Sequence, residues 1–206
     1  MNTHLVDLLA RRPELKICLE EVDEIFHTLV RSLRHGGKLL LCGNGGSAAD
    51  AEHWAGELLK GFVKKRTLPK QERNALPSYL GEKLQGALPA IPLTGFSSLS
   101  TAFANDVDPQ LTFAQLVWGL GKPGDVLIGI STSGNAPNIC AAMETAKAKE
   151  MIRVGLTGQA GGKLLSLTDF CLRVPETETY RVQELHLPIY HCLSLMLEDE
   201  FFPESS

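Results

Sequence analysis

The sequence predicts an α/β domain whose five parallel strands form one sheet with helices on both faces. Three observations indicate this class. Short apolar runs alternate with segments of helical periodicity, glycine-rich loops follow two of the runs, and 206 residues with 44% hydrophobic content can bury a substantial core. We interpret residues 1–206 as a single domain.

The first expected helix covers residues 14–35. Apolar residues recur along it in alternating steps of three and four, and two glycines end it. The recurring residues are Leu15, Cys18, Val22, Ile25 and Leu29. This stripe suits burial in a helical interface between subunits or packing within the chain.

A buried strand is expected at 38–43, and Ser47 is the expected N-cap of a helix that runs to about residue 62. The later elements follow the same alternation. Strands are expected at 88–95, 125–132, 152–158 and 169–175, and helices at 138–150 and 180–201. Two prolines weaken the expected pairing of the strand at 88–95, and Pro188 is expected to interrupt and bend the last helix.

Residues 63–87 do not fit this alternation, because the segment is polar and contains two prolines. We interpret it as an insertion with a short helix near 79–84. Its basic residues are Lys64, Lys65, Arg66, Lys70 and Arg73. They are expected to form a solvated surface, and an anion-facing lid is the alternative.

Composition excludes several classes of protein. A net charge of −4 and a pI near 5.9 argue against a broad nucleic-acid-binding surface. The five cysteines are scattered without a CxxC pair, which indicates free thiols rather than disulfides or a thiolate zinc site. The sequence lacks the apolar core of a signal peptide and any run long enough to span a membrane. A soluble, cytoplasmic protein is expected.

Two glycine- or hydroxyl-rich loops, residues 42–47 and 131–138, each follow a predicted strand and precede a predicted helix. Ligands of open parallel sheets bind beyond the carboxyl ends of the strands. A helix N-terminus offers free N–H groups and a partial positive charge to a phosphate. One such loop can be a plain turn, but two together favour a phosphate-bearing ligand. Neither matches GxxxxGK[ST], so nucleoside triphosphate chemistry is not indicated.

Polar residues on two predicted helices form the second constellation. His53 and Glu57 are four residues apart and share a helix face, although a surface hydrogen bond explains that pair equally well. Gln183 and His191, eight apart, share a broad face of the last helix, and His186 lies toward its flank, where it is expected to pack or to support the face. Imidazole, carboxylate and amide oxygen suit zinc or another divalent cation.

Five segments together resemble the phosphoheptose isomerases. They are residues 43–57, 105–106, 124–135, 155–164 and 181–191. These enzymes have a single sugar-isomerase (SIS) domain with a flavodoxin-like doubly wound sheet. They interconvert sedoheptulose 7-phosphate and glycero-manno-heptose 7-phosphate. The resemblance covers most of the chain except residues 63–87 and implies an aldose–ketose isomerase.

The resemblance also implies roles for individual residues. Glu57 and His191 would carry out the proton transfers of isomerisation. The implied zinc ligands are His53, Glu57, Gln183 and His191. The implied substrate contacts are Asn44, Gly45, Gly46, Glu57, Asn105, Asp106, Ser131, Thr132, Ser133 and Gln183. The family's members are usually homotetramers with active sites at subunit boundaries, so a tetramer is implied as well.

Two residues depart from the family pattern and leave the exact sugar open. Ala136 stands where the family usually has another phosphate-contacting serine, which implies weaker or altered substrate binding. Tyr180 stands near a position that is small or acidic in many relatives.

Two non-catalytic alternatives come from relatives of these isomerases. One is a tetrameric adaptor that binds a replication initiator protein, and the other is a regulator that senses a phosphosugar. An adaptor has no need for the four candidate metal ligands, all of which are retained here. The chain has no residues left over for a helix-turn-helix module. The sequence therefore favours the isomerase.

Overall fold

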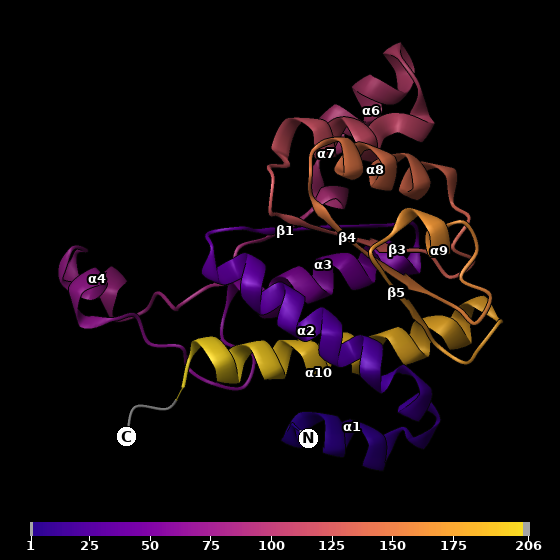
Figure 1. Ribbon diagram of the computed structural model, residues 1–206. Coiled ribbons are helices and arrows are strands. Elements are labelled where there is room, and N and C mark those ends of the chain that lie inside the picture. The colour runs from indigo at the N-terminus through magenta and orange to yellow at the C-terminus, as the bar shows by residue number, and fades with distance from the viewer. Residues whose placement is uncertain (1, 204–206) are drawn as a thin grey trace.

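The computed structural model describes residues 2–203. Its centre is a five-stranded, all-parallel sheet in the order β2-β1-β3-β4-β5 (Figure 1). The strands are β1 Leu39–Gly43, β2 Ala90–Pro92, β3 Val126–Ile130, β4 Ile152–Thr157 and β5 Phe170–Arg173. All five predicted strands are present, and the predicted fold class is confirmed. β1 and β3 pair directly, with Leu39 opposite Val126 and Gly43 opposite Ile130.

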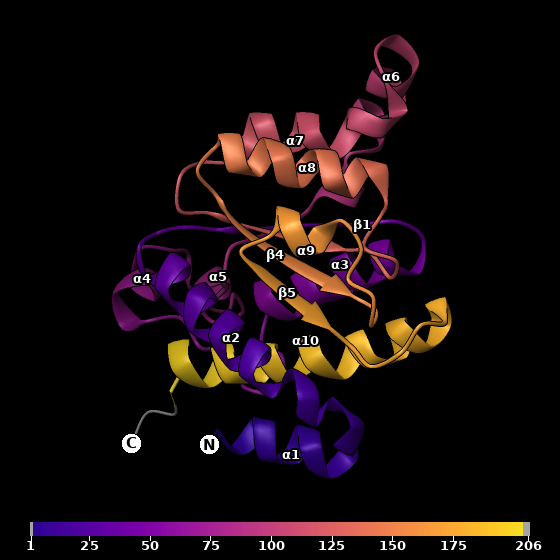
Figure 2. The ribbon, with the colours of Figure 1, turned by 45° about the vertical axis from the view of Figure 1, so that its right-hand side comes forward.

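Helices cover both faces of the sheet (Figure 1, Figure 2). They are α1 Thr3–Arg11, α2 Leu19–Arg34, α3 Gly46–Leu59, α4 Lys70–Asn74, α5 Ser78–Gly81, α6 Ser97–Asp106, α7 Thr112–Leu120, α8 Pro137–Ala148, α9 Leu164–Leu167 and α10 Thr179–Phe201. Successive strand residues point to opposite faces. Leu39 and Leu41 therefore join the core formed with α1, α2, α3 and α10, whereas Leu40 joins the core formed with α7, α8 and α9.

The helix expected at 14–35 is divided. Pro13–Cys18 forms a 3₁₀ helix and α2 begins at Leu19, which agrees with the frequent use of 3₁₀ turns at helix starts. The predicted apolar stripe is buried in the core on the sheet, so packing within the chain accounts for it. Helix α1 was not predicted. Asn2 caps it by accepting a hydrogen bond from the amide of His4, and Leu5 and Leu8 are its buried residues.

Three predictions about individual helices and strands were wrong. Gly45 rather than Ser47 is the N-cap of α3, because the chain turns at Gly45 with a φ of +56°, which residues with a side chain rarely adopt. The strand at 88–95 shrinks to β2, an edge strand where prolines are tolerated, and continues as a 3₁₀ turn. Pro188 does not interrupt α10, since buried Leu185 and Ile189 beside it hold the helix against the core.

Residues 63–87 contain α4 and α5, and a bridge between Thr67 and Gln85 closes the segment. The expected short helix is present as α5. The prediction of a solvated basic surface was wrong for Arg66, which is buried in an ion pair with Glu198. Sequence analysis also assigned no element to residues 96–120, where α6 and α7 lie.

The remaining general predictions concern cysteines and membrane spans. All five cysteines are free thiols. Within residues 2–203, no helix combines the length and apolarity that a bilayer crossing requires.

Candidate active site

The two predicted phosphate loops lie side by side because they follow the paired strands β1 and β3. The strand order reverses at this point, which is where ligands of doubly wound sheets bind. Asn44 in the first loop and Asn138 at the start of α8 exchange two side-chain hydrogen bonds, each 2.9 Å long. The N-termini of α3 and α8 therefore flank one position, where the partial positive charge of each helix favours an anion, although Pro137 at the start of α8 has no N–H group to donate.

Glycine at position 46 allows α10 to approach the first loop. A Cβ atom on Gly46 would lie 2.6 Å from Nε2 of Gln183, closer than real contacts allow. The amide of Gln183 thus lies against the loop, as its predicted contact with substrate requires. Gly45 supplies the turn that directs the loop into α3.

The second loop presents its hydroxyl groups differently. Ser131 is buried and its amide donates to the carbonyl of Leu156 over 3.0 Å, whereas Thr132 is half-buried and Ser133 is exposed. Asn135 fixes the loop by donating to the Ser133 carbonyl and accepting from the Lys163 amide. The hydroxyl groups of Thr132 and Ser133 are the more accessible to a ligand.

The structure brings together three of the four predicted metal ligands, on adjacent faces of α3 and α10. Nε2 of His53 lies 3.2 Å from Oε1 of Glu57. The rings of His53 and His191 meet edge to face with their centroids 5.1 Å apart. Gln183 is eight residues from His191, about 12 Å along the helix axis, and lies at the phosphate-loop end of the same helix pair.

Tyr190 and Asp50, which sequence analysis did not select, orient His53. The hydroxyl of Tyr190 lies 3.2 Å from Oδ1 of Asp50 and 3.0 Å from Nδ1 of His53. Burial and the Asp50 carboxylate raise the pKa of Tyr190, so the hydroxyl keeps its proton and donates it to Asp50. Nδ1 of His53 then donates to the hydroxyl oxygen, which leaves Nε2 facing Glu57. Asp50 could have been found from its spacing of three and seven residues before His53 and Glu57.

Buried atoms without hydrogen-bond partners gather at this point. Within residues 2–203, Oε2 of Glu57, Nε2 of His191 and Oδ2 of Asp50 are buried and accept or donate no hydrogen bond. The ammonium of Lys60 approaches Oε2 of Glu57 only to 3.6 Å. Burial, and secondarily the neighbouring His53, lowers the pKa of His191, so its imidazole is neutral at pH 7. Such atoms are costly unless a ligand satisfies them.

The unpartnered atoms of Glu57 and His191 are of the kinds that bind zinc, although the side chains do not have the geometry of a metal site. Across the described part of the chain, no group of three or more His, Cys, Asp or Glu side chains has metal-binding geometry. Neutral imidazole nitrogen and carboxylate oxygen are nevertheless the donors that zinc prefers. The unpartnered atoms of Glu57 and His191 are therefore compatible with such an ion.

The structure does not bring Asn105 and Asp106 to this group. They end α6, which protrudes from the body and packs on α7 and on the 3₁₀ turn Pro109–Leu111 (Figure 1, Figure 2). Both residues are exposed, and the amide of Asn105 donates to the carboxylate of Asp106 over 2.9 Å. Their contact with substrate stays a prediction.

The buried His186 has a packing role, as one of the sequence interpretations held. It is 0% exposed, and its Nε2 lies 3.3 Å from the carbonyl of Thr157. Burial lowers the pKa of His186 to about 4. It is therefore neutral at physiological pH and belongs to the core beneath the site.

Known proteins share this architecture. A model of the SIS domain family matches residues 16–76 and 85–158, so it covers most of the segment 63–87 that was interpreted as an insertion and leaves out residues 77–84. The chain is 43% identical to a phosphoheptose isomerase of Roseiflexus sp. (strain RS-1), over 87% of this chain and 82% of that protein.

Solved structures agree with the sequence comparison. A phosphoheptose isomerase from Neisseria gonorrhoeae superposes with a TM-score of 0.76 at 33% identity and 95% coverage of both chains. One from Francisella tularensis superposes with a TM-score of 0.78 at 33% identity, over 92% of this chain and 91% of that chain. The protein belongs to the phosphoheptose isomerase family of SIS-domain proteins.

Proposed function

We propose that this protein is an aldose–ketose isomerase that converts sedoheptulose 7-phosphate to D-glycero-D-manno-heptose 7-phosphate. One observation carries the proposal: a half-buried carboxylate, Glu57, and a neutral imidazole, His191, share one site on α3 and α10. The other end of that helix pair meets two loops suited to a phosphate. Relatives that are 39–43% identical carry the name phosphoheptose isomerase, which supports the choice of sugar.

The substrate's phosphate would bind the loops after β1 and β3. Amide groups at the start of α3 and α8 and the accessible hydroxyls of Thr132 and Ser133 supply its hydrogen bonds. The space beside Gly45 is open, and the side-chain amide of Gln183 lies beside Gly46. Such anchoring holds the sugar carbons in one orientation relative to the helix pair. A fixed orientation of the reacting groups lowers the activation barrier.

The reaction moves a carbonyl from C2 to C1 and needs two proton exchanges. Glu57 removes a proton from C1, the freed electron pair forms the C1–C2 double bond, and the π pair of the C2 carbonyl moves onto its oxygen. The same carboxyl then returns the proton to C2 as the C1–C2 double bond is lost and the C1 carbonyl forms. His191 takes the proton of the C1 hydroxyl and delivers it to the oxygen on C2. Each positioned acid or base contributes roughly 10²–10⁴-fold, and the lowered pKa of His191 favours its neutral imidazole.

Zinc is the proposed cofactor, with His53, Glu57, Gln183 and His191 as its ligands. Its positive charge would stabilise the charge that develops on the sugar oxygens between the two proton exchanges. A carboxylate bound tightly to zinc is a weaker base, because the cation lowers its pKa. Activity that falls on chelation would support a catalytic ion, and activity that rises would support an inhibitory or structural one.

We further propose a cytoplasmic homotetramer. The free thiols suit a reducing compartment. Large apolar side chains that are exposed in the single chain, among them Val63 (74%) and Trp118 (58%), offer surface for subunit contacts. Light scattering of the purified protein would measure the number of subunits, and a monomer at micromolar concentration would refute the assembly.

The test of the proposed function is conversion of sedoheptulose 7-phosphate, followed as aldose formation. Glu57→Gln should lower kcat roughly 10²–10⁴-fold, because the amide cannot accept the carbon-bound proton. Glu52→Gln, an exposed position on the same helix, is the matched control and should remain active. If the wild-type protein converts several sugar phosphates no faster than Glu57→Gln does, the isomerase proposal is refuted. The non-catalytic adaptor would then be the favoured hypothesis.

A further inference from the structure

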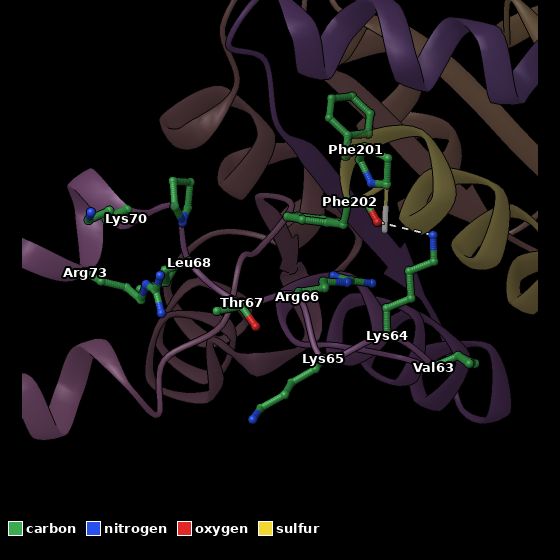
Figure 3. Close-up of a pocket in the computed structure, with 12 residues that line it drawn as sticks. Val63, Lys64, Lys65, Arg66, Thr67, Leu68, Lys70, Arg73, Phe201 and Phe202 are labelled. Atoms are coloured by element: carbon green, nitrogen blue, oxygen red, sulfur yellow. Dashed lines mark hydrogen bonds between the residues drawn. The ribbon is translucent and has the colours of Figure 1, made fainter. Parts of the chain in front are cut away.

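A buried ion pair joins the end of α3 to α10. Nε of Arg66 lies 2.6 Å from Oε1 of Glu198, and the two side chains are 0% and 1% exposed. Figure 3 shows Arg66 beside the ring of Phe202, and the guanidinium carbon lies 4.9 Å from the centroid of that ring. Buried pairs of this kind add little net stability compared with apolar residues. Their presence therefore calls for a role beyond holding the fold together.

Arg66 caps the helix that carries Glu57. Its Nη1 donates to the carbonyl of Leu58 over 2.7 Å, and its Nη2 donates to the carbonyl of Glu57 itself over 2.9 Å. The last carbonyls of a helix have no partner within the helix, and a cation is favourable there. The guanidinium thus fixes the helical turn from which the Glu57 side chain extends.

Glu198 holds the segment that follows α3. Its carboxylate accepts hydrogen bonds from the amides of Phe62, Val63 and Lys64 over 2.8, 2.9 and 3.0 Å. Burial alone would raise the pKa of Glu198, but these three bonds and the one from Arg66 outweigh burial and lower it, so the group stays ionised. The ring of Phe62 in turn packs on the imidazole of His191, with the centroids 5.2 Å apart.

The backbone of Arg66 supports a specific role. Its φ is +39°, a left-handed conformation that residues with side chains seldom adopt. Strain of this kind persists where the surrounding contacts determine the geometry, and it concentrates at functional sites.

We propose that Arg66 and Glu198 are positioning residues for the proton-transfer pair. Arg66 acts on Glu57 through its backbone carbonyl, and Glu198 acts on His191 through Phe62. Both contacts lie at the C-terminal end of α3, whereas the phosphate loops lie at its N-terminal end. The inference rests on the proposed isomerase function and predicts a loss in turnover without a loss in substrate binding.

Two single variants test the proposal. Arg66→Lys keeps a cation opposite Glu198 but loses the fork that reaches two carbonyls. Glu198→Gln keeps the volume and loses the charge. Each should lower kcat roughly 10–100-fold with KM nearly unchanged, because small misplacements of reacting groups cost about that much. Arg34→Met is the matched control, since it breaks the exposed pair with Glu200 at the same end of α10 and should leave both constants unchanged.

A double variant separates positioning from stability. Arg66→Met with Glu198→Leu replaces the pair by apolar residues, which often restores stability, and it should stay slow. Recovery of wild-type kcat in this variant would overturn the proposal, as would single variants that change only the melting temperature or only KM. An inactive wild-type protein in the same assay would instead overturn the proposed function.

Discussion

Helices α3 and α10 carry the predicted proton-transfer residues, and the outer helix α6 carries two predicted substrate contacts. The surroundings of these two sets of residues differ. On the helix pair, the ring of Phe62 packs on His191, Arg66 bonds the backbone carbonyl of Glu57, and His53 lies 3.2 Å from the Glu57 carboxylate. On α6, Asn105 and Asp106 are exposed and contact each other. The single chain therefore brings Glu57 and His191, the predicted proton-transfer residues, to one site and leaves Asn105 and Asp106 outside it.

The stability of the α3–α10 region should depend on His186, a buried residue of α10. The folded state holds this ring neutral with a pKa of about 4, whereas the unfolded chain titrates near 6.5. Its contribution is therefore complete above pH 6.5 and is lost as the pH falls toward 4, by about 3 kcal/mol. Denaturant unfolding at a series of pH values measures this loss.

The control for that experiment compares two histidines. His186→Phe should flatten the acid side of the stability profile, because the ring of similar size no longer titrates. His27→Gln, at an exposed position on α2, should not change the profile. Equal slopes for wild-type protein and His186→Phe would show that the buried ring does not determine the acid stability of this region.

The second test of the helix pair concerns Tyr190. Tyr190→Phe removes the hydroxyl that bonds Nδ1 of His53, so the ring of a proposed metal ligand loses its orientation. Loss of such a partner lowers metal affinity roughly 10–100-fold. Competition with a chelator measures the affinity for zinc, and Tyr79→Phe, which alters an exposed tyrosine on α5, is the control. Unchanged zinc affinity would separate the Tyr190–His53 contact from metal binding.

For α6 the expectation is reversed: a substitution should weaken substrate binding and leave the stability of the protein unchanged. Asp106→Ala should raise KM about tenfold, because a hydrogen bond to a charged group contributes roughly 1.5 kcal/mol or more. The melting temperature should not change, since the side chain is exposed and its hydrogen bond is to the neighbouring Asn105. Ser98→Ala on the same helix should change neither quantity. A KM equal to that of wild-type protein would remove α6 from the substrate site.

The contrast between local and distant contacts explains which features of the structure could be predicted from the sequence. The five strands and the two loops that follow β1 and β3 were predicted from periodicity and motif spacing, because those signals are local. The shared site of His53, Glu57 and His191 was implied only by the resemblance to the phosphoheptose isomerases, because His191 lies on a helix far from the other two in the sequence. The burial of Arg66 did not follow, because a basic residue in a polar segment normally faces solvent. Its partner Glu198 lies 132 residues away, and no local pattern indicates that the two meet.

The smallest predicted effect is at Ala136, which lies in the loop proposed to bind the phosphate of the substrate. It is the N-cap of α8 and makes no side-chain capping bond. Ala136→Ser should lower KM about fivefold, since one added hydrogen bond contributes on the order of 1 kcal/mol. It should also stabilise the protein by a similar amount as a helix cap.

Those two effects of Ala136→Ser can be distinguished. Inorganic phosphate competes only for the phosphate position, so the inhibition constant for phosphate should fall together with KM. Ala136→Gly caps a helix better than alanine but adds no hydroxyl, so it should leave both constants unchanged. A serine variant that raises the melting temperature and leaves KM at its wild-type value would mean that position 136 faces the helix rather than the substrate. The phosphate would then be held by Thr132, Ser133 and the amide groups alone.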